Sequence, residues 1–205
     1  MASRDTVFLD LETTSLRRPW MDAPRQVWDV GYVVWLEGNS KIRREVQFFV
    51  EVETRDADPF ALKINKFYQR YPHYAEPYRN PLPASPHDIL LERSTAAMVL
   101  ANDFRDSIIV GNNPRFDEES LAVLCHEEGH LFDPYYHLID VYALSLGVVM
   151  GANFFNPEEM PYESKNLSQM VGVDPPSKED EHSALADALW AERWYSKLAG
   201  ADTDA

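Results

Sequence analysis

The chain has 205 residues, 45% of them hydrophobic and 26% charged, which predicts a single domain over 1–205 with a substantial core and excludes wholesale disorder. The sequence has no run of roughly 18 apolar residues, residues 1–5 do not form a signal peptide, and Cys125 is the only cysteine, so we expect no membrane span, no internal disulfide and a cytoplasmic protein. The net charge of −15 predicts weak, salt-sensitive binding to nucleic acid and little affinity for long duplex.

The first half of the chain has the residue pattern of three strands. Period-two alternation and β-branched or aromatic residues predict strands over 5–12, 27–36 and 41–50, with a loop over 13–26 and a turn over 37–40. The strand lengths and the turn predict that the three pair antiparallel.

Residues 51–86 form a proline- and tyrosine-rich insertion, in which only 61–68 has the pattern of a helix and 71–83 cannot be regular structure. Two interpretations of its tyrosines stay open. Packing on the core is favoured. The alternative is stacking on unpaired bases beside Lys63, Lys66, Arg70 and Arg79.

The second half alternates helices and short strands. Ser85 and Pro86 have the residue types that open a helix, which we expect to run to 103, and Asp140 can cap a helix over 141–146. The other expected elements are strands over 107–110 and 136–139, helices over 116–128, 166–171 and 182–198, and a frayed tail over 199–205. Strands followed by alternating helices and strands predict an α/β three-layer fold, with a mixed sheet that is antiparallel in its first three strands and then parallel.

Two carboxylates end the first strand. Asp10 and Glu12 are two residues apart, so both side chains point to the same face. Like charges on a buried face repel each other, and a divalent cation between them would remove the conflict. An isolated pair of this kind is more often explained by two side chains that reach water at the strand end.

Further acidic residues and one histidine lie where the same edge of the sheet would gather them. Asp117 follows the strand over 107–110 at the start of the next helix, over the edge where α/β folds bind ligands. His182 stands at the predicted start of the final helix, and Asp187 lies one turn further on. For His182 and Asp187 taken alone, solvation and capping of the helix start are the commoner explanation.

Taken together, these motifs resemble those of the DEDDh family of 3′→5′ exonucleases, which includes proofreading subunits of bacterial polymerases and RNA-trimming enzymes. The resemblance extends over residues 5–198 and rests on three segments of the sequence, FLDLETTSL, GNNPRFDEESL and HSALADALW. It implies a ribonuclease H-like fold and an enzyme that removes nucleoside 5′-monophosphates from single-stranded or frayed 3′ ends of DNA or RNA, in DNA proofreading or repair or in RNA trimming.

The resemblance also implies roles for the residues. Two Mg²⁺ or Mn²⁺ ions about 4 Å apart would hold the attacking and leaving oxygens. Asp10 would bridge the ions, Glu12 and Asp187 would hold the ion that carries the water, and Asp117 would help to hold the other. His182 would be the general base, its charged form disfavoured at a helix N-terminus.

Candidate contacts to the substrate follow from the same resemblance. They are Thr13 and Leu16, which match the family's contacts to the terminal nucleotide, and Arg115, which with Arg17 and Arg18 flanks the proposed site. Solvent-exposed arginines without a ligand are the commoner explanation for these three.

Two alternatives remain. His126, Glu127 and His130 match H-E-x-x-H, the signature of a zinc hydrolase helix, although Gly129 would end the helix before His130. A non-catalytic subunit that docks on a polymerase would lack a catalytic acid, whereas all four acids and the histidine are present. An active enzyme that also docks on a polymerase fits the same residues.

Overall fold

The computed structural model describes residues 3–17, 25–75, 89–152 and 156–200. The predicted helix start at Ser85 and Pro86 lies outside these ranges, as do Arg18, Arg79 and residues 201–205 of the predicted frayed tail. Among the described residues, no helix combines the length and the apolar character that a membrane crossing needs.

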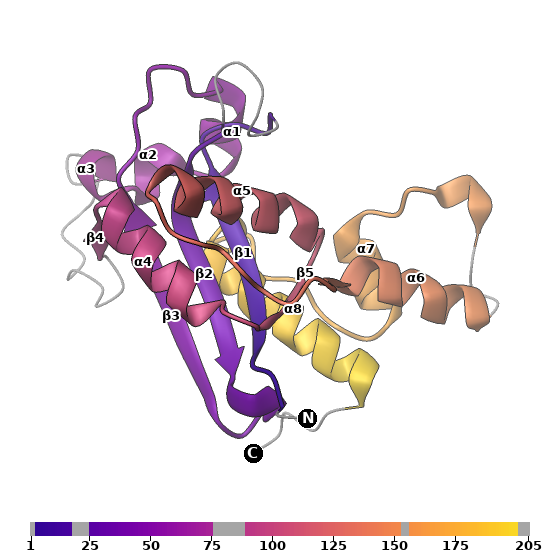
Figure 1. The fold of residues 1–205 in the computed structure, drawn as a ribbon. Coiled ribbons are helices and arrows are strands. Elements are labelled where there is room, and N and C mark those ends of the chain that lie inside the picture. The colour runs from indigo at the N-terminus through magenta and orange to yellow at the C-terminus, as the bar shows by residue number, and fades with distance from the viewer. Residues whose placement is uncertain (1–2, 18–24, 76–88, 153–155, 201–205) are drawn as a thin grey trace.

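The strands form one mixed sheet, drawn in Figure 1. They are β1 (Thr6–Thr13), β2 (Val27–Trp35), β3 (Arg43–Val50), β4 (Leu90–Leu91), β5 (Ile108–Gly111) and β6 (Ile139–Asp140). Their order across the sheet is β4-β3-β2-β1-β5-β6. The pairs β1–β2 and β2–β3 are antiparallel, whereas β1–β5, β5–β6 and β3–β4 are parallel. The predicted fold class, antiparallel first and then parallel, is confirmed.

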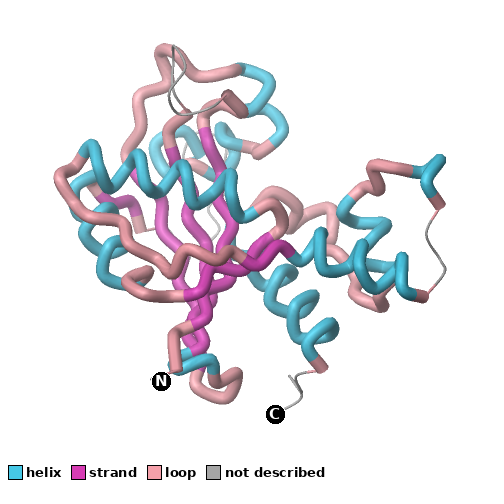
Figure 2. Tube along the Cα trace, turned by 45° about the vertical axis from the view of Figure 1, so that its right-hand side comes forward, coloured by secondary structure: helices cyan, strands magenta, loops and turns pink. Residues whose placement is uncertain are grey.

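Helices cover both faces of the sheet and one of its ends (Figures 1 and 2). They are α1 (Pro59–Ile64), α2 (Phe67–Arg70), α3 (Pro72–Ala75), α4 (Arg93–Asp103), α5 (Pro114–Glu127), α6 (Val141–Gly151), α7 (Ser164–Met170) and α8 (Ala184–Ala199), with 3₁₀ turns η1 (Leu36–Gly38) and η2 (Pro157–Glu159). α4 and α5 pack on one face and α8 on the other, while α6 and α7 lie beyond β5 and β6. α1, α2 and α3 lie at the end of the sheet where β1 finishes.

The alternation along β1 determines which face its carboxylates occupy. Val7, Leu9 and Leu11 are buried in the core shared with α4 and α5. Phe8 is buried on the opposite face, in the core that includes the tryptophans of α8. Since side chains two apart in a strand share a face, Asp10 and Glu12 lie on the side of Phe8, against α8.

Several predicted boundaries in the second half were wrong. α4 begins at Arg93, because the backbone of residues 89–91 pairs with β3 through the Phe49 N–H to Ile89 carbonyl bond of 2.7 Å. β6 is only two residues long, and Tyr136, placed in a strand by its sequence, has 77% of its surface exposed. α6 runs on to Gly151, well past the expected end at 146.

The insertion is more regular than predicted. Residues 59–75 form three short helices rather than one over 61–68, because Lys66 adopts a left-handed φ of 55° between α1 and α2. Pro72 opens α3, at the first helical position where proline needs no hydrogen-bond donor. Tyr71 is buried and stacks on Phe67 at 4.7 Å, as expected from packing on the core, whereas Tyr68 and Tyr74 are exposed.

Candidate active site

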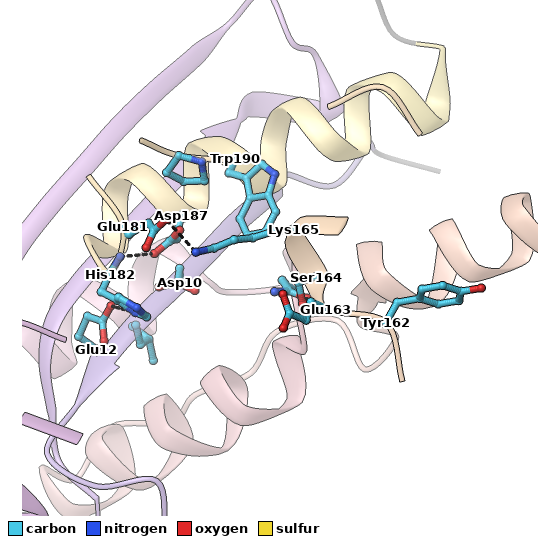
Figure 3. Close-up of a pocket in the computed structure, with 13 residues that line it drawn as sticks. Asp10, Glu12, Tyr162, Glu163, Ser164, Lys165, Glu181, His182, Asp187 and Trp190 are labelled. Carbon is cyan, nitrogen blue, oxygen red and sulfur yellow. Dashed lines mark hydrogen bonds and ion pairs between the residues drawn. The ribbon is translucent and has the colours of Figure 1, made fainter. Parts of the chain in front are cut away.

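Three carboxylates from two distant parts of the chain meet on the α8 side of the sheet. Asp10 and Glu12 come from the end of β1, and Asp187 comes from the first turn of α8. One oxygen from each lies within 4.8 Å of the others. Figure 3 shows the three side chains and His182 among the residues that line a pocket. Among the described residues, this is the group of acidic and histidine side chains arranged to hold a metal ion.

A pocket of 570 Å³ opens over these carboxylates. Its far wall comes from α7 and the residues before it, and its near wall from α8 and the residues that precede that helix. Besides these three acids, the lining includes two more, Glu163 and Glu181, together with residues such as Asn112, Ser164, Lys165, His182 and Trp190. Lys165 is the one lysine or arginine in the described lining, and its Nζ lies 2.7 Å from the Glu181 carboxylate. The pocket therefore combines a cluster of acids with a single cation.

Burial and mutual repulsion raise the proton affinity of the acids. Burial is the main cause of the raised pKa of Asp10, followed by the charges of Asp187, Asp117 and Glu12. Burial also raises the pKa of Glu12, followed by the charge of Asp29. The pKa of Asp187 is raised to about 6, again mainly by burial. The charged form of each carboxylate is thus destabilised, and a bound cation would stabilise it.

His182 precedes α8 rather than opening it. Ser183 occupies the N-cap position without a side-chain capping bond, and His182 has a left-handed φ of 62°, so the predicted helix start at 182 was wrong by two residues. The His182 N–H donates to Asp187 Oδ2 at 3.1 Å, and the His182 carbonyl accepts from Arg70, so a local and a long-range contact together hold this turn before the helix begins. The His182 Nδ1 atom lies 4.0 Å from Glu12 Oε1.

The neutral form of His182 is favoured, as the sequence suggested, but the main cause differs. Burial lowers the pKa of His182 most, the Glu181 carboxylate opposes this, and the cations Lys165, Lys66 and Arg70 lower it further. A histidine in this setting is neutral near pH 7 and can accept a proton.

Asp117 lies near the cluster but outside it. It occupies the first turn of α5 and is buried. Burial raises its pKa, and the positive charge of Arg25 opposes that shift. Its charge contributes to the raised pKa values of Asp10 and Glu12. The sequence therefore placed Asp117 at the correct edge of the sheet, although its oxygens are not within the 4.8 Å group and it does not line the pocket.

Two residues of β2 that the sequence reasoning missed bring α8 to the site. Asp29 is fully buried; its Oδ2 accepts a bond from Arg70 and one of 3.2 Å from the Ala184 N–H, at the start of α8. Gly31 lies opposite Asp10 across the strand pair. A Cβ atom at Gly31 would be 2.1 Å from the Leu185 nitrogen, so only glycine lets α8 approach this closely. The sequence does contain a signal for this close approach, because a charged residue and a glycine interrupt an otherwise apolar strand.

The three expected substrate contacts lie outside the pocket lining. Thr13 is buried, and its Oγ1 donates to the Ser15 carbonyl at 2.8 Å. Leu16 is 61% exposed on the loop after β1. Arg115 is exposed, and its Nε donates to Glu119 Oε1 at 2.7 Å on its own helix.

The H-E-x-x-H segment does not form a helical pair of histidines. α5 ends at Glu127, and Gly129 turns the chain with a φ of 78°, so His130 lies beyond the helix. Glu127 forms an ion pair of 2.6 Å with Arg93. No group of zinc ligands around His126 and His130 occurs within the described ranges.

No model of a known protein family and no curated protein matches this sequence. Solved structures do match its fold. Exonuclease I of E. coli in complex with a dT13 oligonucleotide aligns with a TM-score of 0.65 and 17% identity over 95% of this chain and 40% of that chain. This chain therefore spans well under half the length of exonuclease I.

Two matches of similar size to this chain are also nucleases. The nuclease domain of 3′hExo, described as a DEDDh family member bound to rAMP, aligns with a TM-score of 0.62 and 12% identity over 97% of this chain and 92% of that chain. A 3′-exonuclease that recognises a histone mRNA stem-loop aligns with a TM-score of 0.62 and 11% identity over 98% of this chain and 83% of that chain. At these identities the likeness establishes the fold, which is the ribonuclease H-like fold of these exonucleases.

Proposed function

We propose that this chain is a DEDDh-type 3′→5′ exonuclease that uses divalent cations to hydrolyse single-stranded or frayed ends of DNA or RNA to nucleoside 5′-monophosphates. The observation that carries the proposal is the convergence of Asp10, Glu12 and Asp187 within 4.8 Å, in a pocket that His182 also lines. The shared fold supports it, since the matching structures include exonucleases crystallised with single-stranded DNA and with rAMP.

The donor set fits Mg²⁺ or Mn²⁺, because such hard ions prefer oxygen ligands and the three carboxylates offer only oxygens. Asp10, Glu12 and Asp187 would hold one ion. Asp117, whose charge raises the pKa of Asp10, would help to hold a second. When bound, the ions would stabilise the negative charge that develops on the phosphate and on the leaving 3′ oxygen.

The remaining chemistry falls to two side chains of the chain itself. His182, kept neutral by burial and by neighbouring cations, accepts the proton of the attacking water as general base. Lys165 lies in the pocket wall beside Glu181 and supplies a positive charge for a phosphate of the substrate. In a chain with a net charge of −15, this local cation matters for holding a polyanion.

The test is digestion of 5′-labelled single-stranded DNA and RNA oligomers with Mg²⁺ or Mn²⁺. We expect a ladder that shortens from the 3′ end and stops with EDTA. Asp10→Ala should abolish it. His182→Ala should slow it by about 10²- to 10⁴-fold, the usual contribution of a general base. His126→Ala, which changes an exposed histidine on α5, is the matched control and should behave as the wild type.

Titration with Mn²⁺ by calorimetry gives an independent arm. Asp10→Ala should lose binding, and His126→Ala should retain it. Undiminished cleavage by Asp10→Ala would overturn the proposal. Metal binding without cleavage of either oligomer would point instead to a non-catalytic docking subunit, and zinc binding that depends on His126 would favour the zinc hydrolase.

A further inference from the structure

Few direct contacts fix the imidazole ring of His182. Its side chain is 43% exposed, and its Nδ1 is 4.0 Å from Glu12 Oε1, longer than a hydrogen bond. Within the described part of the chain, the ring forms no hydrogen bond. In the absence of such a bond, the place from which the ring reaches the carboxylates is set by the backbone of His182 and of the residues before it.

That backbone is anchored from the corner between α1 and α2. Lys66 Nζ donates to the carbonyl oxygens of Lys178 at 3.0 Å, Glu179 at 3.1 Å and Glu181 at 3.0 Å. An ammonium group has three hydrogens to donate, and Lys66 donates all three to the segment that leads into His182.

Arg70, at the end of α2, holds the next residue of the same segment. It donates to the carbonyl oxygen of His182 and to the buried carboxylate of Asp29. The N–H of His182 is bonded to Asp187 Oδ2, so both backbone polar groups of His182 have partners. Asp29 also accepts from the Ala184 N–H at 3.2 Å, which ties the chain on the other side of His182 to the sheet.

We propose that Lys66 and Arg70 are positioning residues, which act through His182 by fixing the backbone that carries the general base. The inference rests on the proposed function and adds a role for the insertion, in which Lys66 lies between α1 and α2 and Arg70 ends α2. The competing explanation is that the contacts only stabilise the fold, in which case the loss would not depend on His182.

A double-mutant cycle separates the two explanations. Lys66→Met keeps most of the aliphatic stem and removes the three donors. We expect kcat on a short single-stranded oligomer to fall by about 10-fold or more with KM within about twofold, since small misplacements of a catalytic group have large effects on rate. In a His182→Ala background, the same change should alter the residual kcat by less than about twofold, because coupled residues are not additive.

Lys41→Met is the matched control, because Lys41 is an exposed lysine in the turn before β3, outside the insertion. It should change neither parameter. Lys66→Gln, which retains a neutral amide group with two N–H donors, should give an intermediate kcat and serves as the milder variant if Lys66→Met is poorly folded by circular dichroism.

Hydrogen exchange of the metal-free protein provides a readout that does not depend on activity. Lys66→Met should speed exchange of amides 178–183 and leave those of β1 and β2 unchanged. An equal loss of kcat in both backgrounds, or unchanged exchange in this segment, would overturn the inference. An inactive wild type would overturn the proposed function instead, and the exchange experiment would still decide whether Lys66 holds the segment.

Discussion

Gly31 offers a direct test of how α8 is placed over the carboxylates. A Cβ atom in Gly31→Ala would lie 2.1 Å from the Leu185 nitrogen and 2.2 Å from the Ala184 carbonyl carbon, where real Cβ contacts are essentially never under 3.0 Å. Both neighbours are backbone atoms, so no side chain can rotate away. The start of α8 must move by about 1 Å, and it carries His182 and Asp187 with it.

We expect Gly31→Ala to lower kcat by about 100-fold, the usual effect of a 1 Å misplacement in a catalytic site. Overpacking should lower the free energy of unfolding by about 1–3 kcal/mol. The assays are exonuclease rates on a labelled oligomer, Mn²⁺ binding by calorimetry and urea unfolding followed by circular dichroism. Weaker Mn²⁺ binding should accompany the slower rate, since Asp187 moves relative to Asp10.

Gly147→Ala is the control, because Gly147 lies within α6 and a Cβ atom there has no neighbour within 4 Å. It should leave kcat unchanged and raise the free energy of unfolding by about 0.5–1 kcal/mol, the advantage of alanine over glycine inside a helix. The reasoning would be refuted if Gly31→Ala stayed folded with kcat and Mn²⁺ affinity within threefold of the wild type.

Two further predictions concern charge in the pocket. Lys165→Met should raise KM by about 10-fold with a smaller effect on kcat, because Lys165 attracts the phosphate equally in the ground state and in the transition state. Lys197→Met, on the exposed side of α8, is the control. Equal KM values for the two variants would contradict the role given to Lys165. In the metal-free protein, the pKa of Asp187 is raised to about 6 from an ordinary value of about 4, so the folded state binds more protons than the unfolded state between these pH values. The stability that this group contributes is fully present below about pH 4 and is lost as the pH rises through about 6. From about pH 4 to about pH 6, the melting temperature of the wild type should therefore fall relative to that of Asp187→Asn, and Mn²⁺ should restore it. If the melting temperatures of the two proteins changed equally with pH, Asp187 would not titrate as described.

The sequence predicted the features that depend on local pattern. Alternation along β1 placed Asp10 and Glu12 on one face, and residue types at helix starts placed the cap at Asp140, whose Oδ1 accepts from the Tyr142 N–H at 2.9 Å. The order of strands and helices was enough to predict the mixed sheet, because few topologies satisfy the rules for connections.

The features that were missed depend on contacts between distant segments. Lys66 meets carbonyl groups more than 110 positions away, and Gly31 meets α8 across the layers of the fold. No local periodicity encodes such contacts. The position of His182 outside α8 has the same origin, because Asp29, Arg70 and Asp187 together determine where that helix begins.

The contact between Asp29 and Ala184 also has a consequence during synthesis. These residues are 155 positions apart, and a ribosome adding about 5–20 residues per second needs on the order of 8–30 s to pass from one to the other. During that interval the residues of β1 have been synthesised, whereas those of α8, which carries Asp187, have not. The three-carboxylate cluster therefore cannot form on an incomplete nascent chain, and it is completed only after the residues of α8 have been synthesised.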